Sequence, residues 1–320
     1  MFNTTHTLAG LALARVGLDR HAPYALWTAA IAANLPDIDI VYAFDSTAAY
    51  LQHHRGITHA LVSLPFLSLA LAIVMYYFSG FRGKPRVPLI NHFVVALAAM
   101  ATHPFLDLAN NYGIRLFLPF NQNWSYGDTL FIIDPYLDVI LFAAVVATYL
   151  WRSRRMMVGI AGISLALGYI AVRYELRNIA MQQLEAHLPN TSGLRLAALP
   201  QMLNPLVWTG MVETETSVSN SKIELLSNTV ILASRMPKPP SSPVIDAARS
   251  TRTGRVFDGF ARFPVAMVDE LPEGFRVLLI DYRFYRSSAG TALAAEIRLD
   301  PSLRVQSESM SFTTRIIPNP

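Results

Sequence analysis

The sequence has no cysteine and few charged residues. Without Cys among its 320 residues, disulfide bonds, thiolate catalysis and cysteine-ligated zinc are all excluded. Asp, Glu, Lys and Arg make up 15% of the chain, against about 25% in a typical soluble domain. The net charge of +4 is small and the basic residues stand in short separate groups, so we expect no nucleic-acid partner. The sequence also contains no Walker A, GxGxxG or GxSxG motif.

Long apolar runs fill the first half of the chain. Four of them are typical of membrane-spanning helices, and three of these are followed directly by arginine. The four runs are residues 60–81, 87–106, 138–151 and 156–172. Two earlier runs, residues 6–18 and 24–35, would each form a helix about 20 Å long, shorter than the roughly 30 Å hydrocarbon core. We therefore predict that they form a short helical hairpin.

The composition changes after about residue 174. Residues 222–234 and 275–285 are rich in Val, Ile, Leu, Tyr and Phe and are bounded by turn signals such as Pro272-Glu273-Gly274, which is typical of strands. The predicted fold is a mainly α membrane helical bundle with about four spans and the N-terminal hairpin, followed by a small β-rich soluble domain. The predicted boundaries are 1–173 for the bundle, 174–205 for a linker with a helix, and 206–320 for the water-facing domain.

Histidine and aspartate residues concentrate in the first 140 residues. Imidazole and carboxylate are the ligands that zinc, manganese or iron accept where no thiolate is present. His103 and Asp107 are four residues apart and would share one helical face. Pro36 favours an extended backbone, in which Asp37 and Asp39 would point the same way. The predicted metal ligands are His6, Asp37, His54, His59, His103 and Asp107, with His53 as the substitute for His54.

The candidate ligands and the basic residues fall at opposite ends of the predicted bundle. Following the spans alternately up and down places every candidate ligand at one end, whereas eight of the ten Lys and Arg residues up to residue 155 fall at the other. Ionisable groups at membrane depth are costly, so this convergence indicates a site. By the positive-inside rule the basic end is cytoplasmic. We therefore expect an integral protein of a bacterial-type inner or plasma membrane, with the site and the C-terminal domain extracytoplasmic.

Six short motifs follow one another in this part of the chain. They are His6-x3-Gly10, Leu35-Pro36-Asp37-Ile38-Asp39, His54-Arg55-Gly56-Ile57-Thr58-His59, His103-Pro104-Phe105-Leu106-Asp107, Asn111-Tyr112-Gly113-Ile114-Arg115 and Phe131-Ile132-Ile133-Asp134-Pro135. Their order resembles the YdjM/YbcI-type family of predicted membrane-bound metal-dependent hydrolases. The resemblance covers residues 1 to about 155 and implies a multi-spanning membrane protein with metal-dependent hydrolase activity. More remotely, the order of His and Asp is similar to that in zinc-dependent phospholipase C and the S1/P1 nucleases, although the later His and Glu pair of those enzymes is missing.

These observations predict a metal-dependent hydrolase that acts on a phospholipid or another lipid-linked phosphoester. Zinc is the expected cofactor, with manganese or iron as alternatives, and it would lower the pKa of a bound water towards about 7. Asp39 or Asp134 would act as general base or orient an imidazole ring. Arg55 would bind a phosphate, because its guanidinium matches phosphate oxygens. The expected partners are membrane lipid and the lipid-linked substrate.

Two other classes of protein stay open at this point. A proton- or ion-coupled transporter also carries ionisable residues in its spans, but near the bilayer midplane rather than at the span ends. A non-catalytic protein would use the metal to staple the bundle and its outer domain to bind a protein partner. That alternative requires a closed coordination shell without an open position.

Overall fold

The computed structural model describes residues 1–286, 290–291 and 293–312, and the chain divides into two compact units. The first unit comprises Met1–Asp39, Arg55–Ala180 and Leu199–Trp208. The second comprises Ile40–His54, Met181–Ala198 and Thr209–Pro320. The segment from Ile40 to His54 therefore leaves the first unit directly after one predicted site residue and returns directly before another.

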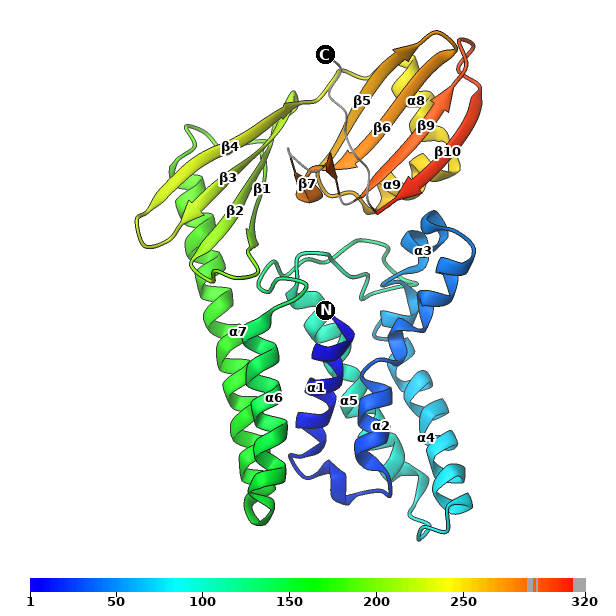
Figure 1. The fold of residues 1–320 in the computed structure, drawn as a ribbon, viewed down its shortest axis with the longest axis vertical. Helices are drawn as coiled ribbons and strands as arrows, with labels where there is room; N and C mark the ends of the chain where they lie inside the picture. Colours follow the sequence, from blue (N-terminus) through cyan, green and yellow to red (C-terminus); the bar gives the residue numbers. More distant parts are fainter. Residues whose placement is uncertain (287–289, 292, 313–320) are drawn as a thin grey trace. The chain divides into compact units, whose positions relative to one another are not determined.

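The first unit is a bundle of helices (Figure 1). Helix α1 packs against α2, α5 and α6, and α5 also packs against α2 and α4. A side chain at Gly10 would lie 2.7 Å from Ala33 Cβ and 2.8 Å from the Ala29 carbonyl oxygen, so only glycine lets α1 and α2 approach this closely. The helices are α1 (Asn3–Ala14), α2 (Ala25–Ala32), α4 (Ser63–Phe81), α5 (Leu89–Ala109), α6 (Pro135–Leu150) and α7 (Arg155–Ala186), with 3-10 turns η1 (Leu18–Arg20) and η4 (Arg152–Arg154).

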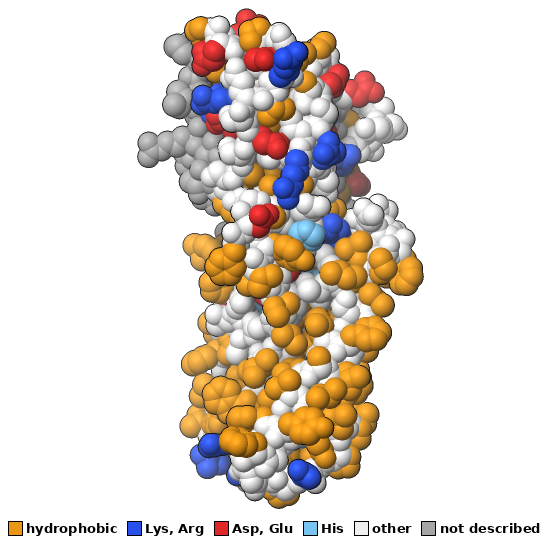
Figure 2. Space-filling model, turned by 90° about the vertical axis from the view of Figure 1, so that its right-hand side faces the viewer, with side chains coloured by type: hydrophobic (Ala, Val, Ile, Leu, Met, Phe, Trp, Pro, Cys, Tyr) orange, Lys and Arg blue, Asp and Glu red, His pale blue; other side chains and the backbone are white. Residues whose placement is uncertain are grey.

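Three helical segments in the described part of the chain are long and apolar enough to cross a membrane. They are Ser63–Phe81, Leu89–Ala109 and Arg152–Ala186. The fourth predicted span corresponds to α6, whose 16 residues extend only about 24 Å. On the face drawn in Figure 2, apolar side chains form a broad band over the helices, with basic side chains beyond one end of the band. The predicted helical bundle is present, with three helices long and apolar enough to span a membrane, and the predicted number of four spans is not confirmed.

The segment that carries Asp37 and Asp39 differs from its prediction. Residues Leu35–Phe44 form the 3-10 helix η2 and are not extended. Proline disfavours the helical conformation only in the residue before it, whereas its own fixed φ suits the first turn of a helix. The amide of Asp37 donates to the Asn34 carbonyl (3.1 Å), which forms the first turn. In a 3-10 helix, residues two positions apart point in different directions, so the two carboxylates do not share one face.

Short elements complete the site region. The 3-10 turn η3 (Ile57–His59) leads into α4. After α5, the chain returns along the end of that helix through isolated bridges that pair Asn110 with Leu130 and Ile114 with Ser125. The loop over residues 110–134 is therefore fixed to the last turn of α5 by backbone hydrogen bonds.

The second unit is rich in β-structure, as predicted, and also contains three helices. Its two four-stranded sheets have the strand orders β1-β2-β3-β4 and β10-β9-β6-β5. In the first sheet β3 pairs antiparallel with β4. In the second sheet all neighbouring strands pair antiparallel. The helices α3 and α8 both pack against α9. The elements are α3 (Thr47–His53), β1 (Arg195–Pro200), β2 (Val207–Glu213), β3 (Ser217–Glu224), β4 (Thr229–Pro237), α8 (Pro243–Ser250), α9 (Arg252–Phe260), β5 (Pro264–Leu271), β6 (Gly274–Asp281), η5 (Tyr282–Phe284), β7 (Tyr285–Arg286), β8 (Gly290–Thr291), β9 (Ala294–Leu299) and β10 (Val305–Ser311).

Candidate metal site

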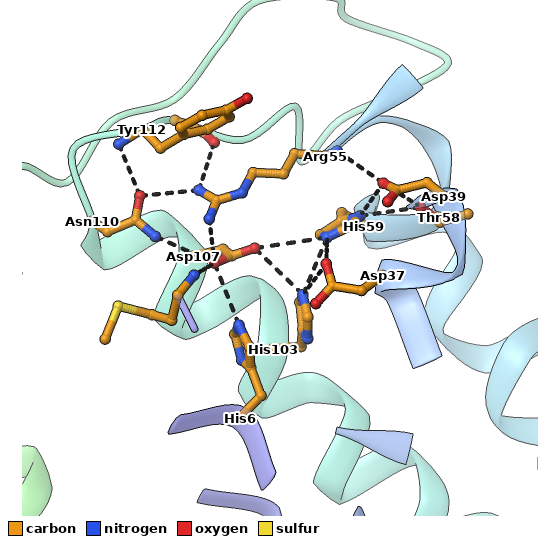
Figure 3. Close-up of polar contacts among 12 residues, drawn as sticks. His6, Asp37, Asp39, Arg55, Thr58, His59, His103, Asp107, Asn110 and Tyr112 are labelled. Carbon is orange, nitrogen blue, oxygen red and sulfur yellow. Dashed lines mark hydrogen bonds and ion pairs between the residues drawn. The ribbon is translucent and has the colours of Figure 1, made fainter. Parts of the chain in front are cut away.

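Five of the six predicted metal ligands gather at one place in the first unit (Figure 3). They come from four separate elements, and all but Asp37 are almost completely buried. Three groups of three satisfy the spacing expected around a metal ion, because one ligand atom from each member lies within 4.8 Å of the others. Two of the groups share His103 and are His59, His103 and Asp107, and His6, Asp37 and His103. The third group is Asp37, Asp39 and His54.

Four side-chain atoms form the centre of the site. The Nε2 atoms of His59 and His103 lie 3.1 Å apart. Asp37 Oδ1 lies 3.2 Å from the first of these nitrogens and 3.5 Å from the second. Asp107 Oδ2 lies 3.7 Å and 3.4 Å from the same two atoms. Each carboxylate oxygen therefore lies within 3.7 Å of both imidazole nitrogens.

These separations are of the size found between ligand atoms of one metal ion. With metal–nitrogen and metal–oxygen bonds of 2.0–2.2 Å, neighbouring ligand atoms in a tetrahedron lie about 3.3–3.6 Å apart. The five separations in the site range from 3.1 to 3.7 Å. These imidazole nitrogens and carboxylate oxygens could therefore hold a metal ion.

Second contacts orient both central imidazole rings. The Nδ1 atom of His103 lies 2.7 Å from the Ala33 carbonyl oxygen, which can only accept a proton. The proton therefore lies on Nδ1 in the neutral ring, and the lone pair on Nε2 points to the centre. His59 Nδ1 lies 3.0 Å from Thr58 Oγ1 and 3.4 Å from Asp39 Oδ2. Asp39 thus occupies the carboxylate position of a carboxylate–histidine–metal arrangement.

His6 extends the site on one side. Its ring stacks on that of His103, with centroids 3.7 Å apart and an interplanar angle of 11°. Its Nε2 lies 3.5 Å from Asp107 Oδ1, but neither ring nitrogen has a hydrogen-bond partner among the described residues. A buried imidazole without partners costs free energy, and an ion near the His6, Asp37 and His103 group would relieve that cost.

Arg55 faces Asp107 instead of an open space. Its guanidinium lies 2.9 Å from Asp107 Oδ1 and donates to Asn110 Oδ1 (3.0 Å) and the Gly113 carbonyl (3.1 Å). It also lies over the Tyr112 ring, 4.5 Å from the centroid. The side chain is buried and its backbone amide donates to Asp39 Oδ2 at 3.0 Å. Arg55 therefore keeps the Asp107 carboxylate ionised and in place, a role that is distinct from the predicted contact with phosphate.

Burial and hydrogen bonding shift the pKa values of the ligands outside the spans. Burial lowers the pKa of the His59 imidazole below its ordinary value, which favours the neutral ring that a metal requires. Burial alone would raise the pKa of Asp37, but hydrogen bonds with His103 and His59 outweigh it and keep that pKa below its ordinary value. Both shifts keep these side chains in the protonation states of metal ligands.

Three further predicted residues make other contacts. His54 and its substitute His53 belong to the second unit, and their rings stack on Tyr50 and Tyr42 respectively. A ring nitrogen of His54 also lies within 4.8 Å of carboxylate oxygens of Asp37 and Asp39. Asp134 precedes α6 and accepts from the Leu137 amide at 3.1 Å and from the Tyr169 hydroxyl at 2.9 Å. It therefore caps a helix and binds a tyrosine, while Asp39 takes the position that orients an imidazole.

Two contacts of the site were absent from the predicted set. Asn110 donates to Asp107 Oδ1 at 3.2 Å and accepts from Arg55, and its position three residues after Asp107 was a signal that it would lie on the same side of α5. The amino nitrogen of Met1 also bonds Asp107. No local pattern predicts the Met1 contact, because it joins residues more than a hundred positions apart.

The fold and the site together define a class of protein. Membrane-length helices, a buried His and Asp cluster at the end of one of them, and a C-terminal β-sheet domain are the features of an integral membrane protein with a candidate metal site. The chain belongs to the YdjM inner membrane protein family, whose model matches residues 1–179. The family recognised from the sequence motifs is thereby confirmed.

A bacterial relative extends the similarity over almost the whole chain. The protein is 26% identical over 316 residues to YfhP of Bacillus subtilis (strain 168), which is described as an uncharacterized protein. The alignment covers 95% of this chain and 92% of that protein. No solved structure matches the chain.

Proposed function

We propose that the protein is a membrane-bound metal-dependent hydrolase that acts on a phospholipid or another lipid-linked phosphoester. One observation carries the proposal: the two histidine Nε2 atoms lie 3.1 Å apart, with carboxylate oxygens of Asp37 and Asp107 beside them. The lone pairs of these atoms repel each other unless a proton or a metal cation lies between them, and at neutral pH a divalent cation can take the place of the proton. Zinc fits the donor set, and manganese and iron accept the same ligands.

Each residue around the metal would have a separate role at such a site. A bound divalent ion would polarise an ester or phosphoryl oxygen and lower the pKa of a water to about 7. Asp37 is the most accessible of the central ligands, with 19% of its side chain exposed, so we place the approach of water and substrate on its side. Arg55 holds Asp107 ionised, and Asp39 holds the His59 ring in orientation. Asp134 keeps a structural role in this mechanism.

The position of the site along the spans favours a lipid substrate. Arg86 precedes α5 by three residues, and the helix from Leu89 to Asp107 extends about 27 Å, close to the thickness of the hydrocarbon core. With Arg86 at one boundary of the membrane, Asp107 lies near the other boundary, at the level of the lipid head groups. A phosphoester linked to a lipid reaches that level without leaving the bilayer.

The membrane orientation is part of the proposal. The loops before α5 and before α7 carry basic residues, so the positive-inside rule places them in the cytoplasm and the site outside it. In this topology α6 is a fourth, shorter span. The cysteine-free chain allows a direct test with Lys84→Cys and Asn123→Cys, both in exposed loops. A membrane-impermeant maleimide should label Asn123→Cys in intact cells and Lys84→Cys only after permeabilisation; the reverse pattern would overturn the orientation.

The metal site is tested by elemental analysis of the detergent-purified protein. We expect about one or two equivalents of a divalent metal in the wild type and their loss in a His103→Ala, Asp107→Ala double variant. An Asp134→Ala variant serves as control and should keep its metal. Freshly purified protein without stoichiometric metal would refute the hydrolase proposal. With metal established, hydrolysis of phospholipid in vesicles that requires the same two side chains would support it.

A metal that only stabilises the bundle is a second candidate function. Four protein atoms already gather at the centre, and structural zinc sites are closed by four protein ligands. Cobalt substitution distinguishes the two functions. Inorganic phosphate should change the cobalt absorption spectrum if the ion has an open position, and should leave it unchanged if the four side chains close the shell.

A further inference from the structure

An apolar groove of about 690 Å³ lies between α5 and α7. Phe105, Leu108 and Ala109 line it from the last turn of α5, and the residues around Ile170 and Ala171 line it from α7. A second apolar cavity of about 200 Å³ shares Phe105, Leu167 and Ile170 with the groove and reaches α1 and α6. The two spaces therefore adjoin each other inside the first unit.

The groove opens between two helices of membrane length, so its surroundings in the cell are lipid chains. A large apolar cavity excludes water, because a buried water needs two to four polar partners. Hydrocarbon fills such a space at little cost, since lipid tails and leucine side chains are equally apolar. The volume is within the range of natural ligand pockets, about 300–1,000 Å³. An acyl chain is therefore the occupant that the lining and the surroundings favour.

The polar end of the groove lies beside the candidate metal site. Gly127 and Thr129 line that end, and the amide of Thr129 donates to the Ala109 carbonyl at 2.9 Å. A side chain at Gly127 would lie 2.4 Å from the Leu108 carbonyl oxygen, so glycine is needed for the loop to pack on α5. The next residue of the same turn, Asn110, donates to Asp107. The groove and the metal ligands thus share the last turn of α5.

The depth of the groove also agrees with a lipid. Glu175 lines it and lies 20 residues after Arg155, the first residue of α7, which corresponds to about 30 Å along the helix. With Arg155 at one membrane boundary, Glu175 lies at the other. The apolar lining residues from Leu167 to Val172 then lie within the hydrocarbon, and the polar ones lie at the head groups.

We propose that this groove binds one acyl chain of a glycerophospholipid and thereby presents the head group at the end of α5 that carries the metal ligands. The inference rests on the proposed function, because it identifies the substrate as a lipid that enters from the bilayer. The groove contributes orientation more than affinity, since the chain moves from one apolar environment to another. Filling the groove should therefore reduce lipid turnover while leaving metal binding intact.

A matched pair of substitutions on α7 tests the inference. Ala171→Trp places an indole in the groove, whereas Ala161→Trp makes the same change at an exposed position of the same helix that does not line it. The probe is a phosphatidylglycerol with a photoreactive group in its acyl chain, in vesicles of phosphatidylethanolamine and phosphatidylglycerol. We expect several-fold less cross-linking to the peptide containing Phe105–Ala109 in Ala171→Trp and no change in Ala161→Trp. Equal cross-linking in both variants and the wild type would overturn the proposal.

A second pair of variants fills the groove only after the protein has folded and been purified. Because the chain has no cysteine, Ala171→Cys and Ala161→Cys each provide a single thiol for modification by a long-chain alkyl maleimide after purification. Modification at residue 171, but not at 161, should lower the cross-linking while the metal content stays constant. Metal-free protein with intact groove cross-linking would refute the proposed function alone. Metal-dependent hydrolysis of phospholipid that is unchanged when residue 171 is modified would refute the groove alone.

Discussion

Replacing Asp39 with asparagine removes the negative charge of this side chain and keeps nearly the same shape. Asp39 is buried, and one of its oxygens accepts from the Arg55 amide at 3.0 Å and lies 3.4 Å from both Thr58 Oγ1 and His59 Nδ1. An asparagine oxygen can still accept from the Arg55 amide. The substitution therefore removes the negative charge behind the His59 ring while keeping the hydrogen bond that closes the loop.

The size of the effect follows from the contacts of His59. Loss of a residue that orients a metal-binding histidine lowers metal affinity by about 10- to 100-fold. Thr58 lies closer to the ring, at 3.0 Å, and can still orient it. We therefore expect Asp39→Asn to weaken affinity by about tenfold, which corresponds to about 1.4 kcal/mol. The double variant Asp39→Asn, Thr58→Ala should approach the upper limit of about 100-fold.

Chelator competition at neutral pH measures this affinity in detergent-purified protein. The matched control is Asp45→Asn, an exposed carboxylate that follows η2 and should leave affinity unchanged. His59→Ala supplies the comparison for loss of a ligand. Unchanged affinity in Asp39→Asn would refute the orienting role, and a loss as large as that in His59→Ala would make Asp39 a ligand itself.

Three further outcomes follow from the same contacts. Arg55→Met removes one of the two cationic groups that contact the buried Asp107 carboxylate, the other being the Met1 amino group, and should lower the stability of the metal-free protein by about 3 kcal/mol in denaturant unfolding, with partial recovery when Asp107→Asn is added. Burial lowers the pKa of His59 in the folded state, so the unfolded state takes up its proton first as the pH falls through about 6.5. The metal-free protein should therefore have a lower melting temperature at pH 5 than at pH 7, and this difference should be smaller in His59→Gln. Asp134→Ala removes the cap of α6 and should cost about 1 kcal/mol in the same unfolding assay without changing metal content, whereas loss of metal would place Asp134 in the site.

The membrane character could be predicted from the sequence because it depends on local composition. A run of about 20 apolar residues buries its backbone polar groups in a helix wherever it occurs, and arginines at its end fix its boundary. Residues 60–81 and 87–106 became α4 and α5 with small shifts in their ends. The run from residue 138 was too short to decide by itself between a span and a helix packed in the bundle.

The ligand types could also be predicted, but their partners could not. His103 and Asp107 are joined by helical periodicity, so their shared face followed from spacing alone. His54 and His59 were both predicted as ligands, but only the fold showed that His59 meets His103 and Asp107, whereas His54 lies near Asp37 and Asp39. The pairing of Arg55 with Asp107 joins residues 52 positions apart, and no local rule specifies it.

The sequence by itself determined the class of this protein: a helical membrane bundle with histidine and aspartate at one end and a β-rich domain after it. These properties follow from hydrophobicity and short-range periodicity, which each segment carries alone. Only the tertiary structure decided which side chains meet, that Asp37 and Asp39 lie on different sides of His59, and that an apolar groove adjoins the site. Those features depend on how distant helices pack, and packing is set by the shapes of all contacting side chains together.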